Sequence, residues 1–263
     1  MTASRPPRTI DMSAPGIPFT RAVAVELRKL VDTRGPLILL GLAALVWAVI
    51  LVIALSQSTP MGFAELLEVF GGGSRIFVGV LTIVLVTAEW GQRAVLTVFT
   101  LEPRRERVIA AKLGAALLGA SALFMSSLAL AATATVIRGG SFAGAGAAVR
   151  SVGIHGLFDV LLAFAMAIVV LNTAGAVVAY LVLPEIVVPA VLFFGGLIVR
   201  DESGDGPTVF DRAADWVSPP RMLKVLDHAM GAQEWAQLLV CTVLWIGLPG
   251  LLGVYRVLKA EVK

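Results

Sequence analysis

Long stretches of apolar residues, separated by short charged segments, restrict the folds that this sequence can adopt. The first of them, Leu37–Leu55, contains no charged side chain. A helix needs about 20 mostly apolar residues to cross the hydrocarbon core of a bilayer. Charged residues make up only 15% of the chain, compared with about 25% in soluble domains. The sequence therefore predicts an all-α integral membrane protein.

Six membrane-spanning helices are predicted from these stretches. Their expected ranges are 37–55, 64–88, 108–136, 154–181, 184–199 and 236–258. The fourth and fifth are separated at Pro184, because proline removes a hydrogen-bond donor and breaks a helix. The second is irregular, since only Ile76–Ala88 is continuously apolar, which is short for a span. Either this helix extends outward through Leu66–Phe70, or it is short and Gly71-Gly72-Gly73 is locally unwound.

Segments outside the spans carry their own patterns. In Phe19–Val31, apolar residues recur at helical spacing opposite Arg and Lys side chains, which predicts a short amphipathic helix on the membrane surface. The same residues are compatible with the cytoplasmic start of the first span. Residues 200–235 are polar and acidic, and we expect an outer loop with two short interfacial helices there. Residues 1–18, rich in Pro, Ser and Thr, are expected to be a disordered cytoplasmic tail.

The basic residues indicate the orientation of the chain. Of the 21 Lys and Arg, six lie in the N-terminal tail and surface helix, five in Glu89–Lys112 and three at the C-terminal end, and seven are spread over the opposite side. Cytoplasmic segments are enriched in Lys and Arg, so both termini are predicted to be cytoplasmic. The net charge of +3 is small and its basic residues lie beside apolar stretches, so nucleic-acid binding is not indicated.

The sequence lacks the motifs that usually accompany catalysis, metal binding or nucleotide binding. It contains no Gly-x-x-x-x-Gly-Lys-Ser/Thr loop and no Gly-x-Ser-x-Gly elbow. His155 and His228 are far apart, Asp159 is a single acid within a span, and Cys241 has no second cysteine to pair with. We therefore predict no catalytic residue, no metal site and no cofactor in this chain.

The charged stretch between the second and third spans resembles a segment of a known transporter family. It runs through Ala88-Glu89-Trp90-Gly91, a Thr-rich segment, Glu102-Pro103-Arg104-Arg105 and Ala110-Ala111-Lys112. This order is similar to that in the membrane-spanning permease subunits of bacterial type-2 ATP-binding-cassette (ABC) exporters. The segment Glu26-Leu27-Arg28-Lys29-Leu30, followed by Asp32-Thr33-Arg34, resembles the amphipathic entry helix of that family. The similarity covers residues 19–263.

The resemblance implies a division of labour between subunits. Two permease subunits, identical or paralogous, would face each other in the bacterial plasma membrane, and two copies of a separate ATPase subunit would bind ATP and Mg²⁺. Residues 89–107 would couple the spans to the ATPase. The residues that the resemblance assigns to this coupling are Glu26, Glu89, Trp90, Arg93, Arg104 and Arg105. The exported compound would be drug-like, a lipid or otherwise amphipathic.

The family places its translocation pathway along the first, second and fifth spans. Here Glu68 and Arg75 are seven residues apart in the second span and lie on nearly the same helical face. We expect them to border the outer end of the pathway as a pair, with the intervening glycines as a hinge. The alternative is that Arg75 extends to the outer lipid headgroups. Phe210 and Trp216 are expected to cap the pathway from the outer loop.

Two other functions are compatible with six spans. One is an integral membrane enzyme acting on lipid, which needs a catalytic constellation that the sequence does not suggest. The other is a membrane scaffold or sensor that transports nothing. The charged stretch also has a simpler interpretation, because a basic loop after a span is often only a topology signal.

Overall fold

The computed structural model describes residues 18–91, 104–199, 208–224 and 231–259, and every regular element in these ranges is a helix. Within these ranges, six helices are long and apolar enough to cross a membrane. They span Arg34–Ser56, Phe63–Trp90, Arg105–Arg138, Ala145–Val170, Thr173–Val199 and Ala232–Lys259. The prediction of an all-α, multi-pass membrane protein is thereby confirmed.

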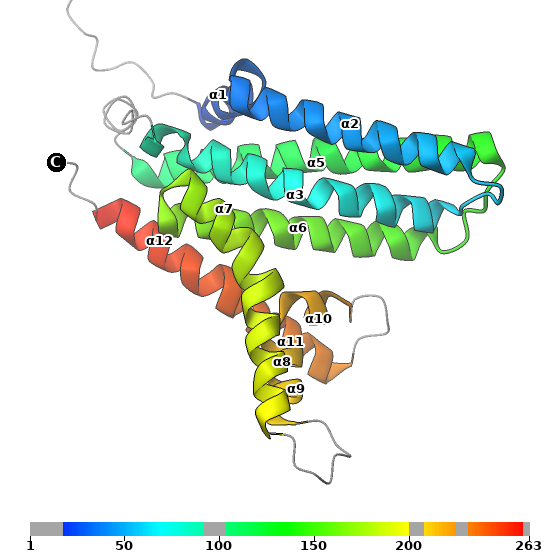
Figure 1. The fold of residues 1–263 in the computed structure, drawn as a ribbon. Helices are drawn as coiled ribbons and strands as arrows, with labels where there is room; N and C mark the ends of the chain where they lie inside the picture. Colours follow the sequence, from blue (N-terminus) through cyan, green and yellow to red (C-terminus); the bar gives the residue numbers. More distant parts are fainter. Residues whose placement is uncertain (1–17, 92–103, 200–207, 225–230, 260–263) are drawn as a thin grey trace, which may run out of the picture.

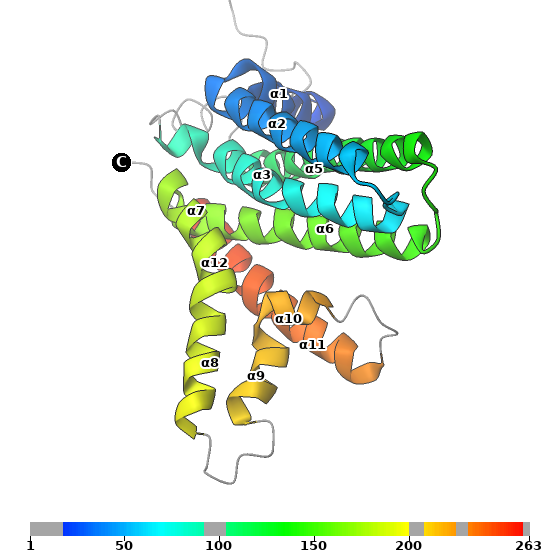
Figure 2. The same ribbon diagram turned by 45° about the vertical axis from the view of Figure 1, so that its right-hand side comes forward.

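The first four spans lie side by side as a bundle, formed by α2 (Arg34–Ser56), α3 (Phe63–Gly91), α5 (Arg105–Arg138) and α6 (Ala145–Val170) (Figures 1 and 2). Helix α3 is central, because its contacts with the other three are the most extensive in the bundle. A shorter helix, α1 (Phe19–Asp32), lies across one end of the bundle, packs mainly on α5 and buries one face. The expected helix at Phe19–Val31 is therefore present.

The fifth span diverges from this bundle (Figure 1). It consists of α7 (Thr173–Val182), the π-helical turn η1 (Leu183–Val187) and α8 (Val188–Val199). Helices α9 (Val209–Val217) and α10 (Pro219–Lys224) follow and lie near α8. The sixth span joins α11 (Ala232–Thr242), η3 (Val243–Gly247) and α12 (Leu248–Lys259), and α12 packs back onto α6.

The turn between the fourth and fifth spans differs from the prediction. The fourth span ends at Val170 rather than Leu181, and Leu171 adopts a left-handed conformation with φ of 55°. The Asn172 side chain then caps α7 by accepting a hydrogen bond of 2.9 Å from the Gly175 backbone N–H. The predicted break at Pro184 is wrong. The helix continues through it, because the wider π turn accommodates a residue without a backbone donor.

Helix α3 is continuous through its glycines, so it includes Leu66–Phe70 and is not unwound. The glycines instead allow neighbouring helices to come close. A Cβ on Gly71 would lie 2.4 Å from Val152 Cγ1 of α6, and one on Gly79 would lie 2.2 Å from the Tyr180 ring of α7. Small residues at such positions are typical of helix packing in membranes. The structure thus gives Gly71 and Gly79 a packing role, and the helix shows no hinge at its glycines.

This packing makes Gly79→Ala a sensitive test of the contact between α3 and α7. The Tyr180 ring is only 5% exposed and has little room to move, so we expect a loss of about 1–3 kcal/mol of unfolding free energy. Gly72→Ala is the matched control, because nothing lies within 4 Å of its added methyl group. Unfolding of both variants in the same detergent gives the comparison. Equal stability of the two would contradict the close approach at Gly79.

Candidate functional site

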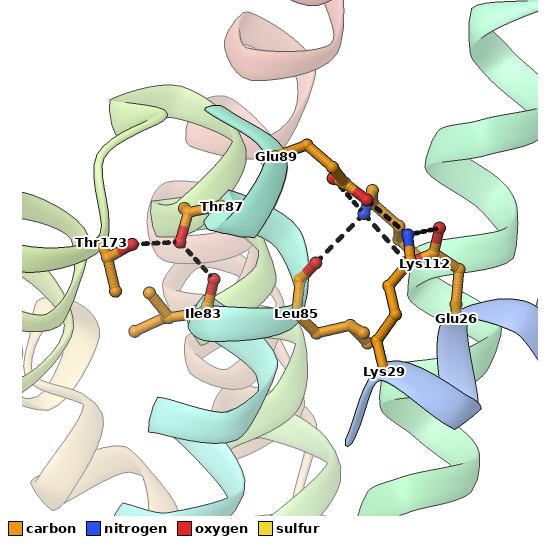
Figure 3. Close-up of polar contacts among 8 residues, drawn as sticks. All are labelled: Glu26, Lys29, Ile83, Leu85, Thr87, Glu89, Lys112 and Thr173. Carbon is orange, nitrogen blue, oxygen red and sulfur yellow. Dashed lines mark hydrogen bonds and ion pairs between the residues drawn. The ribbon is translucent and has the colours of Figure 1, made fainter. Parts of the chain in front are cut away.

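Four charged side chains form a closed ring where α1, α3 and α5 meet (Figure 3). Lys29 Nζ lies 2.7 Å from Glu26 Oε1 and 2.5 Å from Glu89 Oε1. Lys112 Nζ lies 3.0 Å from Glu26 Oε2 and 2.6 Å from Glu89 Oε2. Each lysine therefore bridges both glutamates, so the charges alternate around the ring and sum to zero. We refer to these residues as the four-charge ring.

The four-charge ring forms because α1 carries an acidic residue on its buried face. Glu26 lies on the buried side of α1 and is only 5% exposed, and the ring residues on the other two helices, Glu89 and Lys112, are 8% and 6% exposed. Charges this well buried are stable only when they are paired and hydrogen-bonded. Lys112 Nζ gains a third partner by donating to the Leu85 carbonyl oxygen at 3.1 Å. The ring thus satisfies its own charges while it holds α1 against the bundle.

Small residues on α5 allow α1 to come close enough for these contacts. Ala111 and Ala115 are buried beneath α1, and a Cβ on Gly119 would lie 3.2 Å from Leu30 Cδ1. Ala111, Ala115 and Gly119 recur at four-residue spacing in the sequence, and such a ridge of small residues predicts close helix packing. That prediction is confirmed, and the helix that occupies the ridge is α1.

Glu26 and Lys29 are the ring residues on α1, outside the membrane-spanning segments. Burial lowers the pKa of Lys29, but the hydrogen bonds with Glu26 and Glu89 outweigh this effect and place its pKa above the ordinary value. Since the folded-state pKa is raised, the charge of Lys29 stabilises the fold fully below its unfolded pKa of about 10.4. This contribution is lost as the pH rises through the folded-state pKa.

Arginine keeps its charge at every accessible pH, which provides a direct check on this effect. We expect the alkaline loss of stability in the wild-type protein to be smaller in Lys29→Arg, with Glu26, Glu89 and Lys112 unchanged around it. The measurement is the unfolding midpoint of both proteins from about pH 8 to about pH 12. Identical pH profiles would show that Lys29 does not contribute through its charge.

The structure places the predicted coupling residues in different surroundings. Glu26 and Glu89 meet in the four-charge ring, and Trp90 is half-buried against the core. Arg105 Nη1 donates to the carbonyl oxygens of Val257 at 2.9 Å and Leu258 at 3.3 Å, and so caps the end of α12. Arg104 is exposed at the N-terminus of α5. Arg93 and most of the predicted coupling segment lie outside the described residues.

Further polar contacts connect helices at the end of the bundle that holds the four-charge ring. The Thr87 hydroxyl donates to the Ile83 carbonyl oxygen and lies 2.7 Å from the Thr173 hydroxyl (Figure 3). Arg256 donates to the Val169 carbonyl oxygen at 2.5 Å and thereby caps α6. At this end of the bundle, α1, the C-terminal end of α3 and the N-terminal end of α5 lie together (Figure 1). The polar contacts connect helices that would otherwise be independent spans.

A second charged site lies near the middle of α3. Arg75 Nε lies 2.6 Å from Asp159 Oδ2, and its Nη2 donates to Asp159 Oδ1 at 3.1 Å. Glu185 of η1 lies farther away, with 3.9 Å between its Oε1 and Arg75 Nη2, and the Tyr180 hydroxyl donates to the Arg75 carbonyl oxygen at 3.4 Å. Arg75 therefore connects α3 with α6 and with the fifth span.

The predicted pairing of Arg75 with Glu68 is wrong. Among the described residues, the carboxylates that form ion pairs with Arg75 belong to Asp159 and Glu185. Asp159 is 3% exposed, so its carboxylate requires a nearby cation, and the guanidinium group meets it at two points. Partners within the protein, rather than lipid headgroups, satisfy the charge of Arg75.

Glu68 and Arg75 nevertheless line one cavity of about 330 Å³ between α3, α5 and α6. Hydroxyl groups and His155 also face this space. We call it the polar cavity. Phe210 and Trp216 do not line it. Phe210 of α9 packs against α8, since a Cβ on Gly195 would lie 2.6 Å from its ring, and Trp216 is half-buried in α9.

Comparisons with family models, curated proteins and solved structures found no match to this chain. Among the residues that the structure describes, no three His, Cys, Asp or Glu side chains are grouped so that they could hold a metal ion.

Proposed function

We propose that this chain is the permease subunit of a bacterial ABC exporter. It would form the translocation pathway with a second permease subunit, identical or paralogous, and two copies of a separate ATPase subunit would supply the energy from ATP. The transported compound would be drug-like, a lipid or another amphipathic molecule. Both termini would be cytoplasmic in the plasma membrane, and α1, α9 and α10 would lie in the membrane interfaces.

The observation that carries this proposal is the attachment of α1 to α3 and α5. Residues 92–103 connect these two spans, and the four-charge ring joins α1 to α3 and α5 close to both ends of that connection. A partner that pushes on this end would displace α1 and both spans together, because a rigid, cross-linked group of helices transmits a displacement that a flexible linker absorbs. Such an arrangement suits coupling to an ATPase that docks from the cytoplasm.

The exposed apolar faces of the single chain indicate that further subunits or lipid would cover them. Large side chains such as Leu45 and Val52 on α2, and Phe193 and Ile198 on α8, are more than half exposed within the single chain. In a membrane, lipid or a second permease subunit would cover these faces. The fifth span, which diverges from the bundle (Figure 2), would provide part of the contact between the two permeases.

Co-expression with the P-loop ATPase encoded nearest to its gene tests the proposal. We expect the tagged chain to purify from membranes with this ATPase, and the complex in nanodiscs to hydrolyse ATP. Glu89→Gln should weaken the response of hydrolysis to transported compounds, whereas Glu65→Gln, an exposed position at the other end of α3, should not. A folded chain that recruits no ATPase, or ring variants that respond like the wild type, would refute the assignment.

A further inference from the structure

A second cavity, apolar and of about 510 Å³, lies beside the polar cavity. Leucines of α1, α3 and α5, including Leu30, Leu85 and Leu123, contribute to its wall. The two cavities share Val78 of α3 and Ala120 of α5 as lining residues. Their volumes fall within the range of about 300–1,000 Å³ that is typical of small-molecule sites. Together they offer a polar compartment and an apolar compartment to one ligand.

Besides the Arg75 guanidinium group, which is bound by Asp159, the polar cavity presents hydrogen-bond acceptors, among them the Glu68 carboxylate. His155 Nδ1 lies 2.7 Å from the Ser151 carbonyl oxygen, which can only accept, so Nδ1 carries a proton and donates to it. The Ser121 hydroxyl donates its proton to the Leu117 carbonyl oxygen at 2.8 Å, which leaves its oxygen lone pairs to accept. A ligand that fits these groups has to bring donors.

The charge balance around the polar cavity favours a cation. Asp159 neutralises Arg75, and Glu185 adds a further negative charge 3.9 Å from the guanidinium group. Glu68 lines the cavity, is exposed, and takes part in none of the ion pairs between described residues. Neither Asp159 nor Glu185 lines the cavity, so with Arg75 neutralised by Asp159 the Glu68 carboxylate is the unbalanced charge that a ligand meets there, and it repels an anionic group.

We propose that the two cavities form one binding site for an amphiphilic organic amine. Its ammonium group would bind to the Glu68 carboxylate and to the neighbouring acceptors, and its hydrocarbon part would fill the apolar cavity. The site goes beyond the proposed exporter function, because it is built by a single copy of the chain and needs neither a second permease nor an ATPase. The bound amine is a candidate for the transported compound only if that function holds.

Fluorescent probes with matched tails test the charge preference. Monodansylcadaverine carries a dansyl group and a primary amine, whereas dansyl-aminocaproic acid carries the same group and a carboxylate. We expect the purified chain in nanodiscs of zwitterionic lipid to bind the amine in a saturable manner at neutral pH and to bind the acid at least about tenfold more weakly. Equal binding of both probes, or no saturable binding of the amine, would overturn the proposal.

Two pairs of variants locate the site. Glu68→Gln should weaken amine binding about tenfold, because it removes the charged acceptor, and Glu65→Gln is the control because Glu65 is exposed on the same helix and lines neither cavity. Ala122→Trp should fill the apolar cavity and displace the probe, whereas Ala129→Trp, exposed elsewhere on α5, should not. If each variant binds like its control, the amine does not occupy these cavities. Since the assay contains no ATPase, its outcome is independent of the exporter proposal.

Discussion

Glu89→Lys is expected to remove about 3–5 kcal/mol of the unfolding free energy, the usual cost of breaking a buried ion pair from one side. The substitution leaves three lysine side chains around Glu26, and each of the existing lysines loses one of its two carboxylate partners. Helix α1 should detach first, because the four-charge ring joins it to α3. Denaturant unfolding gives the stability, and faster tryptic cleavage at Arg28, which is exposed on α1, reports its release.

Two further variants distinguish the loss of the four-charge ring from a general effect of adding a lysine. Glu65→Lys makes the same substitution at an exposed position of α3 and should change stability by less than about 0.5 kcal/mol. Reversal of all four charges (Glu26→Lys, Lys29→Glu, Glu89→Lys and Lys112→Glu) restores the alternation and should recover part of the loss. A quadruple variant no more stable than Glu89→Lys alone would argue against a ring held by alternating charge.

Asp159→Ala is expected to cost a similar amount, about 3–5 kcal/mol, because it leaves the Arg75 guanidinium group without its two-point partner. Glu185 cannot replace that partner in place, since it lies 3.9 Å away and its side chain is 47% exposed. Glu185→Gln should therefore change stability by no more than about 1 kcal/mol. The unfolding free energies of these variants in one detergent allow the comparison.

The double variant Arg75→Met with Asp159→Leu tests whether the two residues act as a pair. Apolar residues of similar size often replace a buried ion pair without loss, so the double variant should be more stable than Asp159→Ala. Additive losses in Arg75→Met, Asp159→Leu and the double variant would mean that the two side chains do not interact, contrary to the observed geometry.

The helices were the most predictable part of the fold. Apolar stretches of spanning length and the periodicity of Phe19–Val31 identified six spans and α1, because both signals are local in sequence. The turn at Leu171 was missed, since it lies within a stretch that is apolar on both sides, and only Asn172, a favoured capping residue, marked it. The predicted break at Pro184 was wrong because proline usually ends a helix, whereas here a π turn accommodates it.

For the candidate sites, some of the charged residues could be predicted from the sequence, but their partners could not. Arg75 drew attention because an ionisable residue within a span is costly, and the stretch that begins at Glu89 did so because it is charged and lies between two apolar stretches. The partners could not be read from the sequence, because Lys29 and Glu89 are 60 residues apart and Arg75 and Asp159 are 84 apart. Glu26 on the apolar side of α1 was the available signal that a cation had to approach from another helix, and Lys112 provides it.

The two π turns have a consequence for comparing this chain with others. A π turn contains one residue more than an α turn, and each residue advances a helix by about 100°. The faces of α8 and α12 are therefore rotated by roughly a quarter turn from where an unbroken α-helix would place them. A homologue lacking one residue within 183–187 or 243–247 would replace the π turn by an α turn and present the same face beyond it. Its alignment gap then belongs inside the membrane and not in a loop.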